Sequence, residues 1–179
     1  MRQEIRFSGF GGQGVALAGY VLGKAFALYD GLNAVMTQSY GPEARGGASS
    51  ASVVVSDTEI AYPFVQEPDV LVAFSMEAYS RFYPQVKKDA LILVDQDLVQ
   101  YRPDQWHHAI PASRLADELG RRIVANMVML GFFTAVTGLI SEEGVEKAIE
   151  DTVKPYTLEL NRRALITGLR YGAREEVVP

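Results

Sequence analysis

Short apolar runs separated by turn-forming residues fill the first two thirds of the chain, and longer apolar stretches with helical spacing fill the last third. Runs of this short kind, rich in β-branched and aromatic residues, are typical of strands. They predict strands at 5–7, 34–39, 48–55, 70–74, 90–94 and 108–111. The runs at 70–74 and 90–94 are continuously apolar, which indicates central parallel strands buried on both faces. The last run indicates an edge strand, and 60–63 could add a short hairpin arm.

The stretches between these runs have the spacing and the end signals of helices. They predict helices at 15–27, 76–86, 114–119 and 123–140, another that begins at Ser141, and a last one at 156–171. Ser113 and Ser141 are candidate N-caps, and Pro155 is expected to separate the last two helices.

Strands and helices alternate until helices take over near the end. This order predicts an α/β fold with a doubly wound, mostly parallel, Rossmann-like sheet and a helical C-terminal segment. Neither an internal repeat nor a long linker divides the 179 residues. We therefore expect a single domain over 1–179, with 173–179 as a loose tail.

Composition narrows the possible functions. The net charge of −5 argues against a nucleic-acid surface, which needs a basic face. Because the chain has no cysteine, it can hold neither a disulfide nor a thiolate-ligated zinc or iron–sulfur site. His107 and His108 are its only histidines, and as neighbours they are poorly placed to share a metal ion. We expect no metal site.

The apolar stretch at 123–140 approaches the length of a membrane span. It contains Asn126, two threonines and two glycines, and acidic residues follow it, so a buried helix is the better interpretation. The first residues lack the apolar core of a secretory leader. We expect a cytoplasmic protein with no membrane partner.

A glycine cluster lies between the first strand and the first helix. Gly9, Gly11 and Gly14 have the G-x-G-x-x-G spacing of nucleotide-binding turns. The first glycine would allow the tight turn, the second would let backbone approach an anion, and the third would let the helix pack close to the strand. The helix N-terminus would then offer free N–H groups to a phosphate or carboxylate. The alternative is a turn that serves packing alone.

A nicotinamide site needs an acidic residue at the end of the second strand, to bind the ribose hydroxyls. Asp30 has about the right spacing after the glycines, but it precedes that strand, which ends in Gln38 and Ser39. The sequence therefore disfavours a nicotinamide-dependent dehydrogenase.

A second glycine-rich loop follows the second strand at 39–47. It is expected at the same carboxyl edge of the sheet as the first turn, where open α/β sheets bind ligands. Arg45 offers a fork of donors to a phosphate or carboxylate, and Gly46 and Gly47 would let backbone approach a ligand or partner. Alternatively, the loop is a tight crossover in which Glu43 pairs with Arg45.

Other candidates for chemistry are weaker. His107 and His108 are most simply a surface pair, and Asp95 and Asp97 most simply cap a helix. No Ser-His-Asp order, P-loop or H-E-x-x-H motif is present. The chain therefore offers no catalytic residue and does not look like a complete enzyme.

The segments at 9–15, 39–47, 56–57, 68–71 and 126–131 together resemble a known family. The resemblance runs from about residue 3 to about residue 165, and the combination of two glycine loops is specific. The chain resembles the gamma subunit of 2-oxoacid:ferredoxin oxidoreductases. Among the subfamilies, its sequence is most similar to the 2-oxoglutarate type.

This resemblance implies a subunit of an enzyme complex that oxidatively decarboxylates a 2-oxoacid with coenzyme A to an acyl-CoA and reduces ferredoxin, or that fixes CO2 in reverse. Thiamine diphosphate with Mg, and 4Fe-4S clusters, would be held by partner subunits. This chain would bind no cofactor alone but would help to position coenzyme A. The expected contact residues are Gly9, Gly11, Gly12, Gln13, Gly14, Ser39, Tyr40, Gly41, Glu43, Arg45, Gly46 and Gly47.

Two alternatives to a 2-oxoglutarate subunit stay open. One is a free-standing Rossmann-like nucleotide-binding module. The other is the equivalent subunit for a branched-chain 2-oxoacid, indolepyruvate or pyruvate. Sequence reasoning does not choose the oxoacid, the direction of the reaction or the number of subunits.

Overall fold

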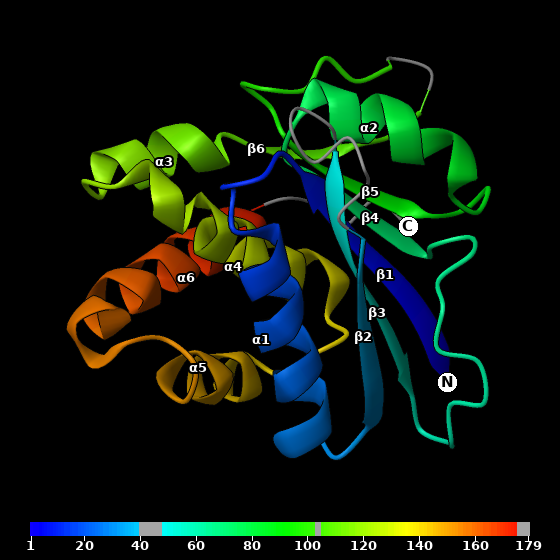
Figure 1. Ribbon diagram of the computed structural model, residues 1–179. Coiled ribbons are helices and arrows are strands. Elements are labelled where there is room, and N and C mark those ends of the chain that lie inside the picture. Colours follow the sequence, from blue (N-terminus) through cyan, green and yellow to red (C-terminus); the bar gives the residue numbers. More distant parts are fainter. Residues whose placement is uncertain (40–47, 103–104, 175–179) are drawn as a thin grey trace.

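A computed structural model describes residues 1–39, 48–102 and 105–174, and it contains a six-stranded sheet in the order β2-β3-β1-β4-β5-β6 (Figure 1). The bounds are β1 Arg2–Gly9, β2 Asn33–Ser39, β3 Ser49–Ser56, β4 Val70–Ala73, β5 Leu91–Asp95 and β6 His108–Ile110. All six expected strands are therefore present. The expected hairpin arm at 60–63 is wrong, because no residue there joins the sheet.

Strand direction decides which ends share an edge. β1, β4, β5 and β6 pair in parallel, whereas β3 pairs antiparallel with both β1 and β2. β2 therefore runs in the same direction as β1, and among these strands only β3 is reversed. The mostly parallel sheet is confirmed, with a β2–β3 hairpin at one side instead of a crossover.

The helices agree closely with the predicted positions. They are α1 Val15–Leu28, α2 Met76–Phe82, α3 Ala112–Glu118, α4 Ala125–Thr137, α5 Glu142–Glu150 and α6 Leu158–Gly172. Three short 3-10 turns adjoin them, η1 Tyr83–Gln85, η2 Arg122–Val124 and η3 Pro155–Thr157. The helical C-terminal segment is confirmed, and Arg174 is the last described residue, so most of the expected tail lies outside the described residues.

Two helix ends differ from expectation. α3 begins at Ala112, so Ser113 lies inside the helix and is not its N-cap. The expected helix at 123–140 divides into η2 and α4, and it ends at Gly138, which has a left-handed φ of 60°. Ser141 does cap α5, because its side chain accepts a hydrogen bond from the Gly144 backbone N–H.

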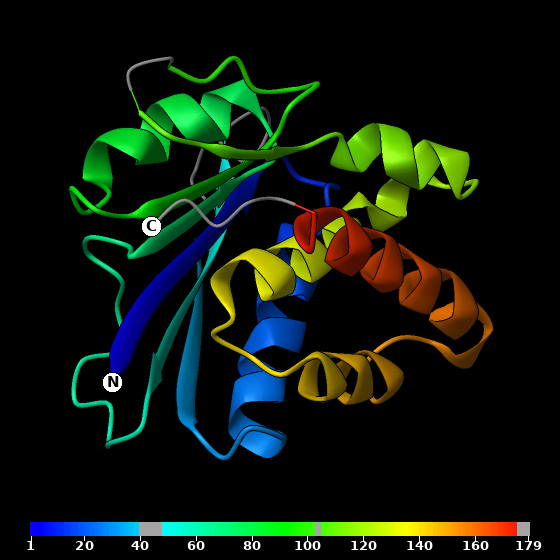
Figure 2. The same ribbon diagram turned by 180° about the vertical axis from the view of Figure 1, so that it is seen from behind.

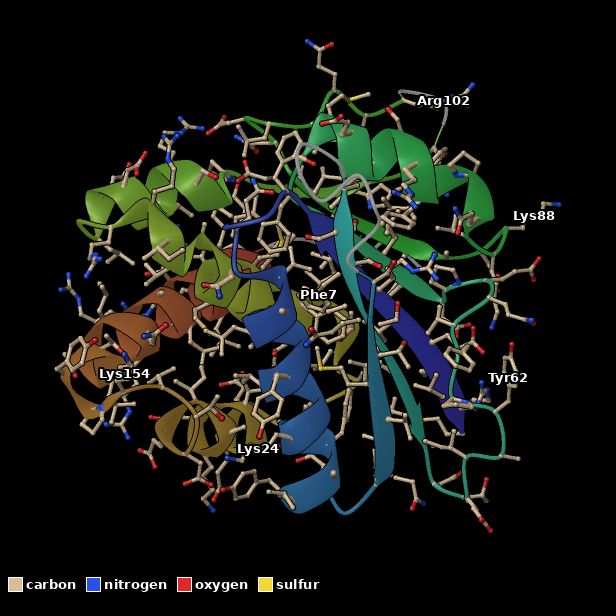
Figure 3. The ribbon with its side chains drawn as sticks, in the orientation of Figure 1. Phe7, Lys24, Tyr62, Lys88, Arg102 and Lys154 are labelled. Atoms are coloured by element: carbon tan, nitrogen blue, oxygen red, sulfur yellow. The ribbon has the colours of Figure 1, made fainter. Side chains whose placement is uncertain are left out.

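Helices cover the two faces of the sheet unequally (Figures 1 and 2). α1 and α4 pack on one face, with α5 and α6 outside them, and the buried side chains of this layer form the larger core. Phe7 of β1 projects into that core, against Phe133 of α4 (Figure 3). α2 alone packs on the other face, over β4 and β5. The core therefore fixes β1 and α1, which carry the first glycine turn.

α4 is buried along almost its whole length. Among the described residues, no helix combines the length and the apolar character that a bilayer crossing needs. α4 meets α6 at two glycines. A Cβ added at Gly131 of α4 would lie 2.1 Å from the Leu165 carbonyl oxygen of α6, and a Cβ added at Gly168 of α6 would lie 1.8 Å from the Val128 carbonyl oxygen of α4. The two backbones therefore touch directly.

Candidate functional site

The glycine turn joins the C-terminal end of β1 to the N-terminal end of α1. Gly12 and Gly14 have φ values of 89° and 73°, a left-handed region that favours glycine. Gly14 is the N-cap of α1, and its carbonyl oxygen accepts the first helical hydrogen bond, from Ala18 at 3.0 Å. An added Cβ at Gly11 would meet nothing within 4 Å, so its backbone is open to a ligand.

The Gln13 side chain fixes the shape of this turn. Its Oε1 accepts a hydrogen bond from the Phe10 backbone N–H at 2.7 Å, and its Nε2 donates to the Phe74 carbonyl oxygen at 3.1 Å. An added Cβ at Gly9 would lie 2.5 Å from the same Oε1 and 3.0 Å from the Phe74 Cβ. Gln13 thus ties the turn after β1 to the end of β4, and Gly9 leaves room for that tie.

Gly14 has a different neighbour from the one that the sequence suggests. The third glycine was expected to let α1 pack close to the strand, but an added Cβ would lie 2.4 Å from Nδ2 of Asn126, on α4. That amide donates to the Gly14 carbonyl oxygen at 3.2 Å. The close approach is therefore between helix and helix, because the first turn of α4 lies beside the start of α1.

A cavity of about 820 Å³ opens at this edge of the sheet. Four groups of residues line it: the glycine turn, the segment that follows β4 with the start of α2, the segment that follows β5, and the segment from α3 to α4. They are Phe10, Gly11, Gly12, Gln13, Phe74, Ser75, Met76, Glu77, Ser80, Leu98, Ser113, Arg122, Ile123 and Ala125. The cavity lies at the carboxyl end of β1 and β4, as expected for ligands of α/β sheets.

The rim of the cavity is mainly apolar, and a few polar side chains such as Arg122 lie among the apolar ones. Phe10, Met76 and Ile123 are 39%, 41% and 51% exposed, which is high for large apolar side chains. Arg122 bonds with Asp117, whose carboxylate raises the pKa of the guanidinium. The apolar rim suits a long apolar part of a ligand or a contact with another chain, and the open backbone at Gly11 is the candidate point for an anionic group.

Only part of the second glycine loop can be placed. Ser39 ends β2 opposite Ser50, next to Ser49, which pairs with Gly9 and donates from its hydroxyl to the Gly9 carbonyl oxygen at 3.1 Å. The expectation that both loops leave the same edge is therefore supported at Ser39. The other predicted contact residues of this loop lie outside the described residues: Tyr40, Gly41, Glu43, Arg45, Gly46 and Gly47.

Asp95 has the helix-capping role that the sequence favours. Its fully buried carboxylate accepts hydrogen bonds from the backbone N–H and the hydroxyl of Ser113, at 2.9 and 2.7 Å. Ser113 lies in the first turn of α3. Asp95 thus satisfies the start of α3 from the end of β5. Asp97 pairs instead with Arg114 on the surface of the molecule.

The expectation of a surface histidine pair is wrong. His107 and His108 are 8% and 3% exposed, because β6 joins β5 and brings them under aromatic rings. His107 Nε2 lies 2.9 Å from the Tyr79 hydroxyl, and its ring stacks on Tyr83 and Tyr101. Burial by aromatic neighbours gives the pair a packing role away from the cavity.

Sequence reasoning missed the segment that follows β4. Phe74, Ser75 and Met76 line the cavity as closely as the glycine turn does. The sequence does indicate that a turn to a helix lies there, because a continuously apolar strand is followed by Ser75, which caps α2. What was missing was the strand order, which places β4 directly beside β1.

The chain matches known proteins over nearly its whole length. The family model described as pyruvate ferredoxin/flavodoxin oxidoreductase matches residues 4–171. The 2-oxoglutarate synthase subunit KorC of Methanothermobacter thermautotrophicus is 52% identical over 178 residues, covering 94% of each chain.

Two solved structures have the same fold. The gamma subunit of a keto/oxoacid ferredoxin oxidoreductase from Geobacter sulfurreducens is 41% identical with a TM-score of 0.86, over 96% of this chain and 97% of that one. The 2-oxoglutarate:ferredoxin oxidoreductase of Magnetococcus marinus, solved with 2-oxoglutarate, coenzyme A and succinyl-CoA bound, is 25% identical with a TM-score of 0.86, over 99% of this chain and 32% of that one. The chain therefore belongs to the pyruvate ferredoxin/flavodoxin oxidoreductase family and corresponds to its gamma subunit, as the two glycine loops predict.

Proposed function

We propose that this chain is the gamma subunit of a 2-oxoglutarate:ferredoxin oxidoreductase. The complex would convert 2-oxoglutarate and coenzyme A to succinyl-CoA and CO2 and reduce ferredoxin, or run in reverse. The observation that carries the proposal is the glycine turn and its cavity, in a chain 52% identical to a 2-oxoglutarate synthase subunit. The chain alone is proposed to be inactive, because its sequence has no Ser-His-Asp order, P-loop or H-E-x-x-H motif.

The cavity is proposed to hold part of coenzyme A next to a partner subunit. Coenzyme A combines phosphates with a long, flexible pantetheine arm. The open backbone at Gly11 and Gly12 suits an anionic group, and Phe10, Met76 and Ile123 suit the arm or an apolar partner surface. Arg45 is proposed to add a phosphate contact from the second loop.

The other cofactors are proposed to belong to partner subunits. Thiolate ligands for 4Fe-4S clusters cannot come from a chain without cysteine. Within the described residues, no group of three carboxylates or histidines is arranged to hold a metal ion, and Mg with thiamine diphosphate is proposed to bind to a partner subunit. Ferredoxin would meet the complex through the cluster-bearing chains.

A titration of coenzyme A with the reconstituted complex tests the proposed site. Gln13→Ala removes the tie between the two cavity loops and is expected to raise the KM for coenzyme A about tenfold, an effect of about 1.4 kcal/mol. The KM for 2-oxoglutarate should change much less. Gln3→Ala, at the opposite end of β1, is the matched control.

The result also separates the alternatives. An unchanged KM for coenzyme A in Gln13→Ala, with assembly intact, would contradict a coenzyme A site at the glycine turn. A complex that prefers pyruvate, indolepyruvate or a branched-chain 2-oxoacid over 2-oxoglutarate would show that the oxoacid assignment is wrong. A chain that joins no thiamine-containing partner would support a free-standing nucleotide-binding module.

A further inference from the structure

The face of the sheet opposite α1 is unusually polar at β1 and β3. Alternation along β1 sends Ile5 and Phe7 into the large core and turns Arg6 to the other face. On the adjacent β3, Ser50 and Ser52 share that face with Arg6, and Arg6 is paired with Ser52 in the sheet register. A positively charged group and two hydroxyls are thus fixed side by side on rigid strands.

A groove of about 350 Å³ lies over these residues. α2 covers β4 and β5 on this face, and its Phe82 reaches Arg6 of β1 at the border of the groove. Its lining residues are Arg6, Thr37, Gln38, Ser39, Ser50, Ser52, Phe64, Val65, Arg81, Phe82 and Gln85. Among the described residues, the lining includes two arginines and no acidic side chain, and it shares no residue with the cavity at the glycine turn.

Arg6 is held in place by neutral acceptors alone. It is only 8% exposed, and its guanidinium donates to Ser52 Oγ at 3.2 Å, Gln85 Oε1 at 2.9 Å and the Val65 carbonyl oxygen at 3.0 Å. A guanidinium has five N–H donors, so these three bonds leave two donors over. The ring of Phe82 lies 4.9 Å below the charge.

A carboxylate does not neutralise this charge within the described part of the chain. Glu4, the nearest acid on the same strand, bonds with Arg2 and with the Gln66 backbone N–H. Burial lowers the pKa of Arg6, an effect that the negative charge of Glu4 partly offsets and that Arg81 reinforces. Because Glu4 offsets the burial only in part, a bound anion would add to the charge balance of Arg6.

The two serines place hydroxyl groups at the groove beside Arg6. Ser50 and Ser52 are only 7% and 6% exposed, and both line the groove. The Ser52 hydroxyl oxygen accepts a hydrogen bond from Arg6. An acceptor atom in the groove could take a hydrogen bond from each of these hydroxyls.

We propose that this groove binds an oxyanion group, a carboxylate or a phosphate, through Arg6 with Ser50 and Ser52. The remaining guanidinium N–H groups supply charge-assisted hydrogen bonds, and the hydroxyls bond to the second oxygen. Small organic acids and an acidic side chain of a partner subunit share this chemistry. The site is independent of the coenzyme A proposal, since it uses other residues on another face of the sheet.

A titration of the full chain by NMR tests the proposal. The probes are acetate and inorganic phosphate, with chloride at equal ionic strength as the control. One of the two oxyanions should shift the Arg6 Nε–H and Ser52 amide signals saturably, and Arg6→Gln should weaken that binding at least tenfold. Arg2→Gln, an exposed arginine on the same strand, is the matched control and should leave binding unchanged.

Arg6→Gln removes structural hydrogen bonds and could unfold the chain, so Ser50→Ala is the second variant. It removes one small hydroxyl at the groove, so it should fold normally but bind the oxyanion several times more weakly. If neither acetate nor phosphate shifts these signals more than chloride does, or if Ser50→Ala binds as well as wild type, the proposal is overturned.

Assembly with the partner subunits distinguishes the two sources. If a partner carboxylate occupies the groove, Ser50→Ala weakens assembly, and acetate or phosphate competes with assembly of the wild-type chain. If a free organic acid or phosphate is the ligand, assembly is the same for both chains and the oxyanion binds the finished complex. A finished complex that binds no oxyanion and assembles equally with both chains would overturn the proposal.

Discussion

Gly14 shows how much a single residue can constrain the candidate site. Its φ of 73° is unfavourable for any residue with a Cβ, and the space that a Cβ would fill is occupied by Asn126. This glycine therefore sets both the entry into α1 and the contact between α1 and α4. Spacing in the sequence identified the residue, but Asn126 is 112 residues away and only the fold brings it close.

Gly14→Ala is expected to lower the free energy of unfolding by about 1–3 kcal/mol, through backbone strain and the clash with Asn126. Urea denaturation of the purified chain measures the loss. Gly11→Ala is the control, because it meets nothing within 4 Å and should change stability little. Equal stability of Gly14→Ala and wild type would show that the turn relaxes freely.

Arg45 carries the prediction for the second loop, outside the described residues. Arg45→Ala is expected to weaken the complex or to raise the coenzyme A requirement, because a forked donor to phosphate is lost. Native mass spectrometry and coenzyme A titration measure the two effects. Unchanged assembly together with unchanged coenzyme A dependence would count against a role for Arg45.

Residue-level prediction succeeded where local geometry decides and failed where distant chain segments meet. The glycines at the turn follow from spacing alone. The Gln13 bridge to Phe74 depends on β4 lying beside β1, and the burial of His107 depends on rings from other segments. Neither partner is visible in a local pattern.

At the scale of elements, α4 and α6 make the closest backbone approach at glycines among the described residues. Gly131 and Gly168 each face a backbone carbonyl of the other helix at a distance that excludes a methyl group. The glycines therefore bring α6 onto α4, and α4 in turn contacts the glycine turn through Asn126.

Gly168→Ala is expected to destabilise the chain by about 3 kcal/mol or more, because two packed helices must separate. Thermal and urea unfolding measure the loss. Gly23→Ala is the control, since its Cβ would lie 3.9 Å from Met36 and alanine is the better helix former, so stability should rise slightly. A neutral Gly168→Ala would contradict the tight crossing.

Most helices and strands were predictable because the spacing of apolar residues and the helix-capping residues are local features of the sequence. The start of α3 was not, because its first turn is satisfied by Asp95 from β5 instead of by a local cap. The hairpin arm at 60–63 failed for a similar reason. In the described sheet it pairs with no strand, and the Tyr62 carbonyl oxygen accepts a hydrogen bond from the Arg2 side chain instead.

At the scale of the whole molecule, the sheet places two kinds of chemistry on separate surfaces. The carboxyl edge carries the glycine turn and the large cavity, whereas the face opposite α1 carries the Arg6 groove. The alternation of strands and helices predicted the fold class. It did not predict that β3 is reversed, because the order and direction of strands depend on contacts between distant segments. That order is what assembles the cavity.

The most direct test of the proposed function is ferredoxin reduction by the thiamine- and cluster-bearing partner subunits, assayed with 2-oxoglutarate and coenzyme A, with and without this chain. We expect reduction to depend on the chain, with the chain alone inactive. Equal rates in its absence, or turnover by the isolated chain, would contradict its assignment as a noncatalytic subunit of a 2-oxoglutarate:ferredoxin oxidoreductase.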